Sequence, residues 1–196
     1  MLTGTYATQT LYGNGGDDTF VSLLGRFYDS VDGGAGTDTL DHSASDYAGD
    51  TFDFSTGLYT GTHANGTINL ASIEIYRDGS GANTIVSSGS GQTLYGNDGD
   101  DTLIAVSGAE TMYGGAGIDT ADLSRGDFVY TFDTQTGLSV EYGSFELYLE
   151  FERFIFGGAN DTITTQTTSN AVETVIAGDG NDTIIDRTGM GAGDLD

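Results

Sequence analysis

Residues 78–122 read, in units of nine, DGSGANTIV, SSGSGQTLY, GNDGDDTLI, AVSGAETMY and GGAGIDTAD. In every unit the seventh residue is threonine, the eighth is apolar, and the sixth has an oxygen-bearing side chain. The units follow one another without an insertion or a deletion. A fixed period of this kind is typical of a solenoid, so the sequence predicts a stack of repeated structural units.

Each nine-residue unit predicts a Gly-rich turn followed by a very short strand. Side chains alternate along a strand, so the apolar eighth residue points to the interior and its two neighbours point outward. Two units bring the chain back to its starting side, and one coil therefore takes two nines. This spacing stacks Asn83, Asp101 and Asp119 on one edge and Gln92 and Glu110 on the opposite edge.

The edge of Asn83, Asp101 and Asp119 has the chemistry of a cation site. Its loops are rich in glycine, which allows the backbone to turn carbonyl oxygens inward. Neighbouring side chains on this edge lie about one strand spacing apart, roughly 4.8 Å. Ca²⁺ accepts six to eight oxygen ligands in flexible geometry, so the sequence predicts calcium binding at this edge.

Two units resemble the RTX, or hemolysin-type, calcium-binding nonapeptide G-G-x-G-x-D-x-U-x. They are Gly33–Asp41 (GGAGTDTLD) and Gly114–Asp122 (GGAGIDTAD), where the small Ala121 occupies the U position. The resemblance implies an all-β fold, a right-handed parallel β-roll, with Ca²⁺ between successive loops on one edge. It also implies a secreted or surface bacterial protein that is exported by a type I system. The edge of Gln92 and Glu110 departs from the pattern, and we expect it to bind little or no calcium.

The resemblance implies that loop carbonyls and loop acids hold the ions. The expected metal ligands are Gly13, Gly15, Asp17, Asp18, Gly34, Gly36, Asp38, Asn83, Gly96, Asp98, Gly99, Asp100, Asp101, Gly115, Gly117, Asp119, Gly157, Asp161, Gly178, Gly180 and Asp182. An isolated loop aspartate is more often part of an Asx turn, but six sixth-place aspartates in register with glycine favour ligation. The acids at the third and fifth places either bind or stay solvated. We expect roughly three to five ions per chain.

The chain is expected to form a single domain, residues 1–196, as part of a larger secreted protein. Roll segments are predicted at residues 4–41, 78–122 and 157–185, and two inserts of longer strands at residues 42–77 and 123–156. The inserts are copies of each other, since Thr51-Phe52-Asp53 matches Thr131-Phe132-Asp133. They are rich in Phe, Tyr and Leu, and we expect them to supply most of the hydrophobic core. A turn is expected near residues 56–57.

Charge and composition exclude several classes of function. There are 30 acidic residues against 5 arginines, and the net charge of −25 excludes nucleic acid as a partner. No cysteine is present, which excludes disulfides and thiolate metal sites. No apolar run approaches the roughly 20 residues of a membrane span. His42 and His63 are far apart in sequence, and we expect both to lie at the surface rather than to bind zinc. The remaining expected partners are calcium ions and neighbouring domains of a parent protein.

A catalytic reading of the inserts stays open as an alternative. Some β-solenoids act on polysaccharides, and such an enzyme needs paired acids with a basic residue in a groove. The acidic and basic residues available are Asp46, Asp50, Asp53 and Arg77 in the first insert, and Glu146, Glu150, Glu152 and Arg153 in the second. They form no recognised motif, so we expect a non-catalytic module. A carbohydrate-binding spacer is a further alternative. Tyr95 and Tyr113 are expected to stack on one outer face, as an aromatic ladder.

Overall fold

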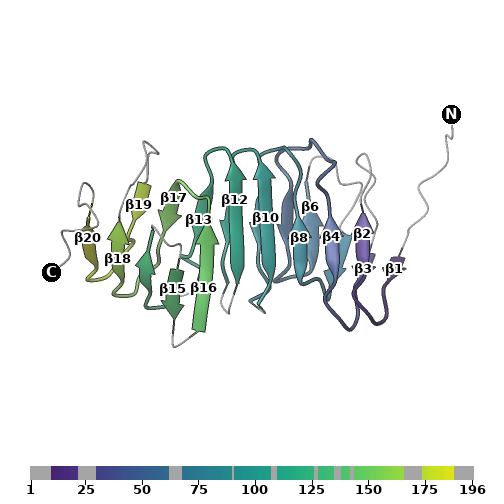
Figure 1. Cartoon of the computed structure of the whole chain (residues 1–196), viewed down its shortest axis with the longest axis horizontal. Coiled ribbons are helices and arrows are strands. Elements are labelled where there is room, and N and C mark those ends of the chain that lie inside the picture. The colour runs from purple at the N-terminus through teal and green to yellow at the C-terminus, as the bar shows by residue number, and fades with distance from the viewer. Residues whose placement is uncertain are drawn as a thin grey trace.

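The computed structural model describes residues 10–21, 30–61, 68–89, 91–106, 110–125, 128–134, 138–141, 144–165 and 174–187. These residues form twenty short strands and no helix. Within this part of the chain, therefore, no helix is long and apolar enough to cross a membrane. The strands build an elongated stack of two facing sheets, with the first described strands, from residue 10, and the last, up to residue 186, at opposite ends of the long axis (Figure 1).

Each sheet has ten strands, and successive roll strands alternate between the sheets. In spatial order the first sheet contains β1 (Thr10–Tyr12), β3 (Ser30–Asp32), β7 (Ile68–Ala71), β6 (Leu58–Thr60), β5 (Thr51–Asp53), β9 (Thr84–Val86), β11 (Thr102–Ile104), β13 (Thr120–Asp122), β17 (Arg153–Ile155) and β19 (Thr174–Ile176). The second sheet contains β2 (Thr19–Val21), β4 (Thr39–Asp41), β8 (Ile75–Arg77), β10 (Thr93–Asp98), β12 (Thr111–Ala116), β16 (Ser144–Leu149), β15 (Leu138–Glu141), β14 (Thr131–Asp133), β18 (Thr162–Thr165) and β20 (Thr183–Asp186).

The nine-residue period is confirmed by the strand register. Strands β9, β11 and β13 pair in parallel, so that Ile85 lies beside Leu103 and Leu103 beside Ala121. Strands β10 and β12 pair in the same way in the other sheet, with Leu94 beside Met112. All five of these eighth-place side chains are fully buried between the sheets. The architecture is the expected parallel β-roll.

The inserts differ from the roll in their pairing rather than in strand length. In the first insert β5, β6 and β7 pair antiparallel within the first sheet, and the turn between β5 and β6 spans residues 54–57, as predicted. In the second insert β14, β15 and β16 pair antiparallel within the second sheet. Each insert thus adds two extra strands to one sheet before the chain returns to the roll. The two extra antiparallel strands return the chain to the side of the roll that it left, so they do not change the side themselves. The chain instead crosses between the sheets three times from residues 33–38 to residues 78–83, and three times from residues 114–119 to residues 157–161, so the Gly-rich loops that follow each insert are shifted by half a coil.

The inserts supply every aromatic side chain of the buried core in the described part of the chain, as expected from their composition. In the first insert Phe52 packs between Tyr59 and Tyr76, with ring centroids 4.5 and 4.6 Å apart. His42 belongs to this cluster, at 4% exposure and edge-on to Phe52. The prediction of a surface His42 was therefore wrong, and burial lowers the pKa of its imidazole to about 4. The other histidine, at position 63, lies outside the described residues.

Candidate calcium-binding edges

The loops between the two sheets lie on two opposite edges of the roll. We call the edge where the chain passes from the first sheet to the second the first edge. Its described loop residues are 13–18, 33–38, 72–74, 87–89, 91–92, 105–106, 110, 123–125, 128–130, 157–161 and 177–182. The second edge is the one where the chain passes back, and its Gly-rich loops are residues 78–83, 96–101 and 114–119.

Sixth-place acids stack in register on the second edge. The backbone N–H of Asp101 donates to Oδ1 of Asp119 at 2.8 Å, and the N–H of Asn83 donates to Oδ1 of Asp101 at the same distance. Both aspartates are at most 1% exposed. Their Oδ2 atoms are buried and have no hydrogen-bond partner within the chain. A buried, unpaired carboxylate oxygen is costly, so each Oδ2 is a group that a cation would satisfy.

Glycines bring backbone carbonyls close to these oxygens. Gly117 has a φ of 152°, and a Cβ there would collide with the carbonyl oxygen of Gly99 in the preceding loop. Gly96 faces both the carbonyl oxygen of Gly114 and the free Oδ2 of Asp101. Only glycine tolerates this approach and this φ together. The loops therefore form a cradle of carbonyl and carboxylate oxygens between neighbouring rungs.

The same arrangement recurs near the N-terminus, on the first edge. The N–H of Asp18 donates to Oδ1 of Asp38 at 2.8 Å, and Oδ2 of each aspartate is buried without a partner. Gly34 and Gly36 have φ values of 101° and 146° and lie against carbonyls of the preceding loop. Near the C-terminus, the N–H of Asp161 donates in turn to Oδ1 of Asp182 at 2.9 Å.

The acids at the fifth place take part in the stacking. The N–H of Thr37 donates to Asp17 at 2.8 Å, and the N–H of Ile118 donates to Asp100 at 2.9 Å. These carboxylates therefore join one loop to the next along the edge. The third-place acid Asp98, in contrast, is exposed on the outside of its loop.

Two further acids, Glu74 and Glu152, end these stacks and were missed as ligand candidates. Oε2 of Glu74 accepts the N–H of Asp38, and Oε2 of Glu152 accepts the N–H of Asp119, each at 2.8 Å. Two residues before each glutamate the backbone is left-handed, and the carbonyl of that residue faces the first glycine of the adjoining loop. The signal was present in the sequence as a glutamate that ends each insert at an equivalent position.

The loops of the calcium-binding type do not share one edge, contrary to expectation. Asp18, Asp38, Asp161 and Asp182 lie on the first edge, whereas Asp101 and Asp119 lie on the second. The half-coil shift at each insert causes this change of side. Gln92 and Glu110 consequently share the first edge with Asp38. All the residues predicted as ligands lie in described loops of these two edges or, for Gly96, Asp98 and Gly115, in the last residues of the strands that lead into them: Gly13, Gly15, Asp17, Asp18, Gly34, Gly36, Asp38, Asn83, Gly96, Asp98, Gly99, Asp100, Asp101, Gly115, Gly117, Asp119, Gly157, Asp161, Gly178, Gly180 and Asp182.

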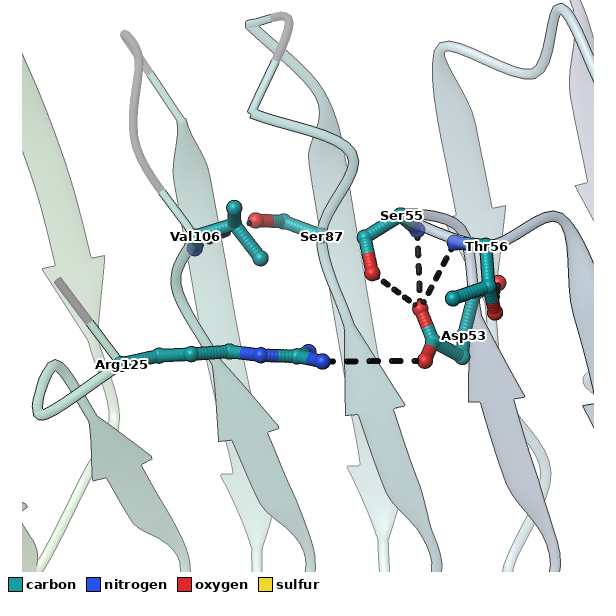
Figure 2. Close-up of polar contacts among 6 residues, drawn as sticks. All are labelled: Asp53, Ser55, Thr56, Ser87, Val106 and Arg125. Carbon is teal, nitrogen blue, oxygen red and sulfur yellow. Dashed lines mark hydrogen bonds and ion pairs between the residues drawn. The ribbon is translucent and has the colours of Figure 1, made fainter.

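The middle of the first edge is closed by hydrogen bonds instead. The Ser87 hydroxyl donates to Glu110 at 2.6 Å and accepts the N–H of Val106 at 3.0 Å. Figure 2 shows Ser87 beside Val106 in the loops above the first sheet. These contacts satisfy the Ser87 hydroxyl and Oε1 of Glu110.

Electrostatics on the second edge favour a cation. Burial raises the pKa of Asp101 to about 8, with further contributions from the nearby carboxylates of Asp78 and Asp119. Burial also raises the pKa of Asp119 to about 6. Within the described part of the chain, no three acidic or histidine side chains converge into a metal-binding group of their own. A cation here would therefore draw much of its coordination from backbone carbonyls, as Ca²⁺ does.

Comparison with known protein families agrees with this geometry. The family model of the RTX calcium-binding nonapeptide repeat matches the chain four times, at residues 10–26, 23–46, 86–121 and 167–189. This chain carries RTX repeats. The family is a structural, calcium-binding repeat that is typical of secreted bacterial proteins, and it builds β-rolls. A search of curated proteins finds no match to the chain.

In the first insert of this RTX roll, the catalytic candidates Asp53 and Arg77 lie on different sheets. Asp53 accepts hydrogen bonds from Ser55 and Thr56 and lies 4.0 Å from Arg125 (Figure 2). Burial acts to raise the pKa of Asp53, but these hydrogen bonds and the arginine hold it below its ordinary value.

The basic candidate of the first insert lies on the other sheet. The Arg77 guanidinium covers the ring of Tyr95, 4.4 Å from its centroid. Tyr95 in turn stacks on Tyr113, with centroids 4.7 Å apart, which confirms the expected ladder. In the second insert, Glu152 is engaged with a roll loop, and the side chain of Glu146 lies outside what the structure describes.

Proposed function

We propose that this chain is a non-catalytic module that folds when it binds calcium outside the cell. The observation that carries the proposal is the set of buried sixth-place carboxylate oxygens without hydrogen-bond partners, at Asp18, Asp38, Asp101 and Asp119. They stand in register along the edges and face carbonyl cradles. Among the described side chains, five loop interfaces have an acid at this place in both of the neighbouring coils, and we take these as the ion sites. The acid pairs are Asp18 with Asp38, Asp38 with Glu74, Asp101 with Asp119, Asp119 with Glu152, and Asp161 with Asp182.

The ligands proposed are the carbonyls and acids of these loops. Sixth-place acids supply carboxylate oxygens, and the glycine-rich backbone supplies carbonyl oxygens. Asp17 and Asp100 each accept a backbone N–H of the next loop, so we propose that they hold the loops in register rather than bind the ion. Asp98 and Asp179 are exposed and contribute charge near the edge. Glu74 and Glu152 complete the last site of their stacks.

Repulsion between acidic side chains explains how folding would depend on calcium. The chain has a net charge of −25, and its acids are concentrated where rungs meet. At the low calcium concentration of a cytosol these acids repel one another and oppose stacking. Extracellular calcium modules bind with dissociation constants of about 10⁻⁴–10⁻³ M, so external calcium would fill the sites. The free energy of binding then becomes free energy of folding. This suits a protein that is exported unfolded through a type I system.

The direct test is a calcium titration of the metal-free chain. Circular dichroism should show a gain of β-structure as calcium is added to protein prepared in excess chelator, and magnesium should produce much less. Native mass spectrometry or equilibrium dialysis should count up to five ions. A chain that is fully β-structured in chelator, and binds no calcium, would refute the proposal.

One variant pair sharpens this test. Glu74→Gln keeps an oxygen that can accept the N–H of Asp38 but removes the charge, and it should lose one ion from the N-terminal stack. The matched control is Asp46→Asn, which removes one exposed charge in the first insert. Retention of the full ion count by Glu74→Gln would remove Glu74 from the proposed ligands.

A further inference from the structure

At one interface between neighbouring loops of the second edge, the backbone has the shape of an ion site, but protein side chains occupy the place of the ion. The line of sixth-place residues on this edge runs Asp50, Asn83, Asp101, Asp119 and Glu152, each directly before a strand of the first sheet. At the Asp50–Asn83 interface, Gly79 and Gly81 press against the carbonyl oxygens of Ser45 and Tyr47. Gly117 presses against the carbonyl of Gly99 in the same way. The carbonyl cradle is therefore preserved at this interface.

The carboxamide of Asn83 occupies this cradle. Its Oδ1 accepts the N–H of Asp50 at 3.0 Å, as Oδ1 of Asp119 accepts the N–H of Asp101. Its Nδ2 donates to the carbonyl of Tyr47 and to Oδ2 of Asp78, both at 3.0 Å. The two amide protons thus satisfy a carbonyl and a carboxylate, the kinds of oxygen that would otherwise face an ion.

The acids around this cradle are already satisfied by protein groups. The Tyr59 hydroxyl donates to Asp50 at 2.6 Å, and the Tyr76 hydroxyl donates to Asp78 at 3.1 Å. Both tyrosines are fully buried and pack on Phe52. The free Oδ2 atoms of the next two rungs along this edge have no such donors.

On the first edge, the loop that adjoins the first insert is also closed by a side-chain carboxamide. There the sixth-place residue is Gln92, whose amide nitrogen donates to the carbonyl of Ile73 at 2.5 Å. Its amide oxygen accepts the N–H of Ser88 at 2.6 Å. Both edges are therefore closed by a carboxamide where the first insert meets the central roll.

We propose that the Asn83 side chain takes the place of a calcium ion, so that this rung closes without metal. This junction then forms a metal-free platform on which the central stack is built as ions bind. The inference rests on the proposed calcium function and specifies which rung is exempt from it. According to this inference, the identity of residue 83 determines whether a side-chain amide or a cation fills this interface.

Asn83→Asp is the decisive variant. It replaces the donating NH₂ with an oxygen that faces the carbonyl of Tyr47 and Oδ2 of Asp78. Three oxygens then converge in a cradle that a divalent cation can neutralise. We expect the variant to bind one more calcium ion than the wild-type chain, and to need at least about tenfold more calcium for half-maximal folding. The control is Asn69→Asp, which adds the same charge at an exposed strand position and should leave the ion count unchanged.

The ion counts separate the two proposals. If the wild-type chain binds calcium and Asn83→Asp binds one ion more, the inference stands. If both bind the same number, the inference is overturned while the calcium module remains. If the wild-type chain binds none, the proposed function falls and the inference falls with it.

A measurement on the wild-type chain covers the case in which the variant does not fold. In chelator, hydrogen exchange should be at least about tenfold slower for the amides of Asp50 and of β5, β8 and β9 than for those of β2 and β4. Equal exchange in the two regions would overturn the inference.

Discussion

Replacing Asp119 with asparagine should affect stability in opposite directions with and without calcium. The Asp119→Asn side chain keeps an oxygen that can accept the N–H of Asp101, so the hydrogen bond between these loops survives. The buried Oδ2 becomes an NH₂ group, and the charge is lost. The pKa of Asp119 is raised to about 6 from the ordinary value of 3.8, so its ionisation destabilises the metal-free fold as pH rises from about 4 through 6. Without calcium, at about pH 8, the variant should therefore be more stable than wild type.

With calcium the order should reverse. An ion held at one hundred times its dissociation constant stabilises a fold by about 2.7 kcal/mol. Asp119 takes part in two loop interfaces, one shared with Asp101 and one with Glu152. The variant should thus lose between about 2.7 kcal/mol, for one ion, and about 5.4 kcal/mol, for both.

The assay is circular dichroism at about pH 8: urea unfolding in excess calcium, and osmolyte-induced folding in chelator, which measures the stability of a metal-free state that is largely unfolded. Ion counts on the same samples establish how many sites are lost. Asp46→Asn, at an exposed aspartate, controls for the change in net charge. Equal destabilisation in chelator and in calcium would mean that Asp119 has only a packing role, and would refute the reasoning.

Three further outcomes follow from the geometry. In the folded metal-free state at about pH 7 Asp101, with its pKa near 8, is largely protonated, so calcium binding to chain held folded by an osmolyte should release about one proton; calorimetry in buffers of different ionisation enthalpy measures this release, and heats independent of the buffer would contradict it. Gly117→Ala should destabilise the calcium-bound fold by about 1–3 kcal/mol more than Gly49→Ala, as urea unfolding measures. Both glycines have a positive φ, but a Cβ at Gly117 would meet the carbonyl of Gly99, whereas Gly49 has open space there. Equal losses of stability would show that only the backbone conformation matters. Tyr59→Phe should cost about 1–3 kcal/mol in chelator, because it leaves the buried Asp50 carboxylate without its hydroxyl donor; unchanged thermal unfolding would show that the donor is dispensable.

The repeat itself was predictable because it is local. A nine-residue unit fixes its own turn and strand, and the burial of Ile85, Leu94 and Leu103 follows from alternation alone. The aromatic core of the inserts and the Tyr95–Tyr113 ladder followed from composition and spacing. These features depend on intervals within the sequence, which the fold preserves.

The position of the edges was not predictable from intervals within one segment. Whether Asp38 and Asp101 share an edge depends on how many times the chain crosses between the sheets within the first insert. The antiparallel pairing of β5, β6 and β7 decides this, and it involves contacts between distant residues. The roles of Glu74 and Glu152 were missed for the same reason, since each acts through the loop beside it in space. Burial of His42 likewise depends on Phe52 and Tyr76 closing over it.

The half-coil shift at each insert has a mechanical consequence. A roll loaded with ions along a single side would be drawn tighter on that side than on the other, and it would curve as it filled. Here the loaded loops alternate sides from one segment to the next, so the contraction in one segment is offset by that in its neighbour. We therefore expect the long axis in Figure 1 to keep its direction as the sites of different segments fill.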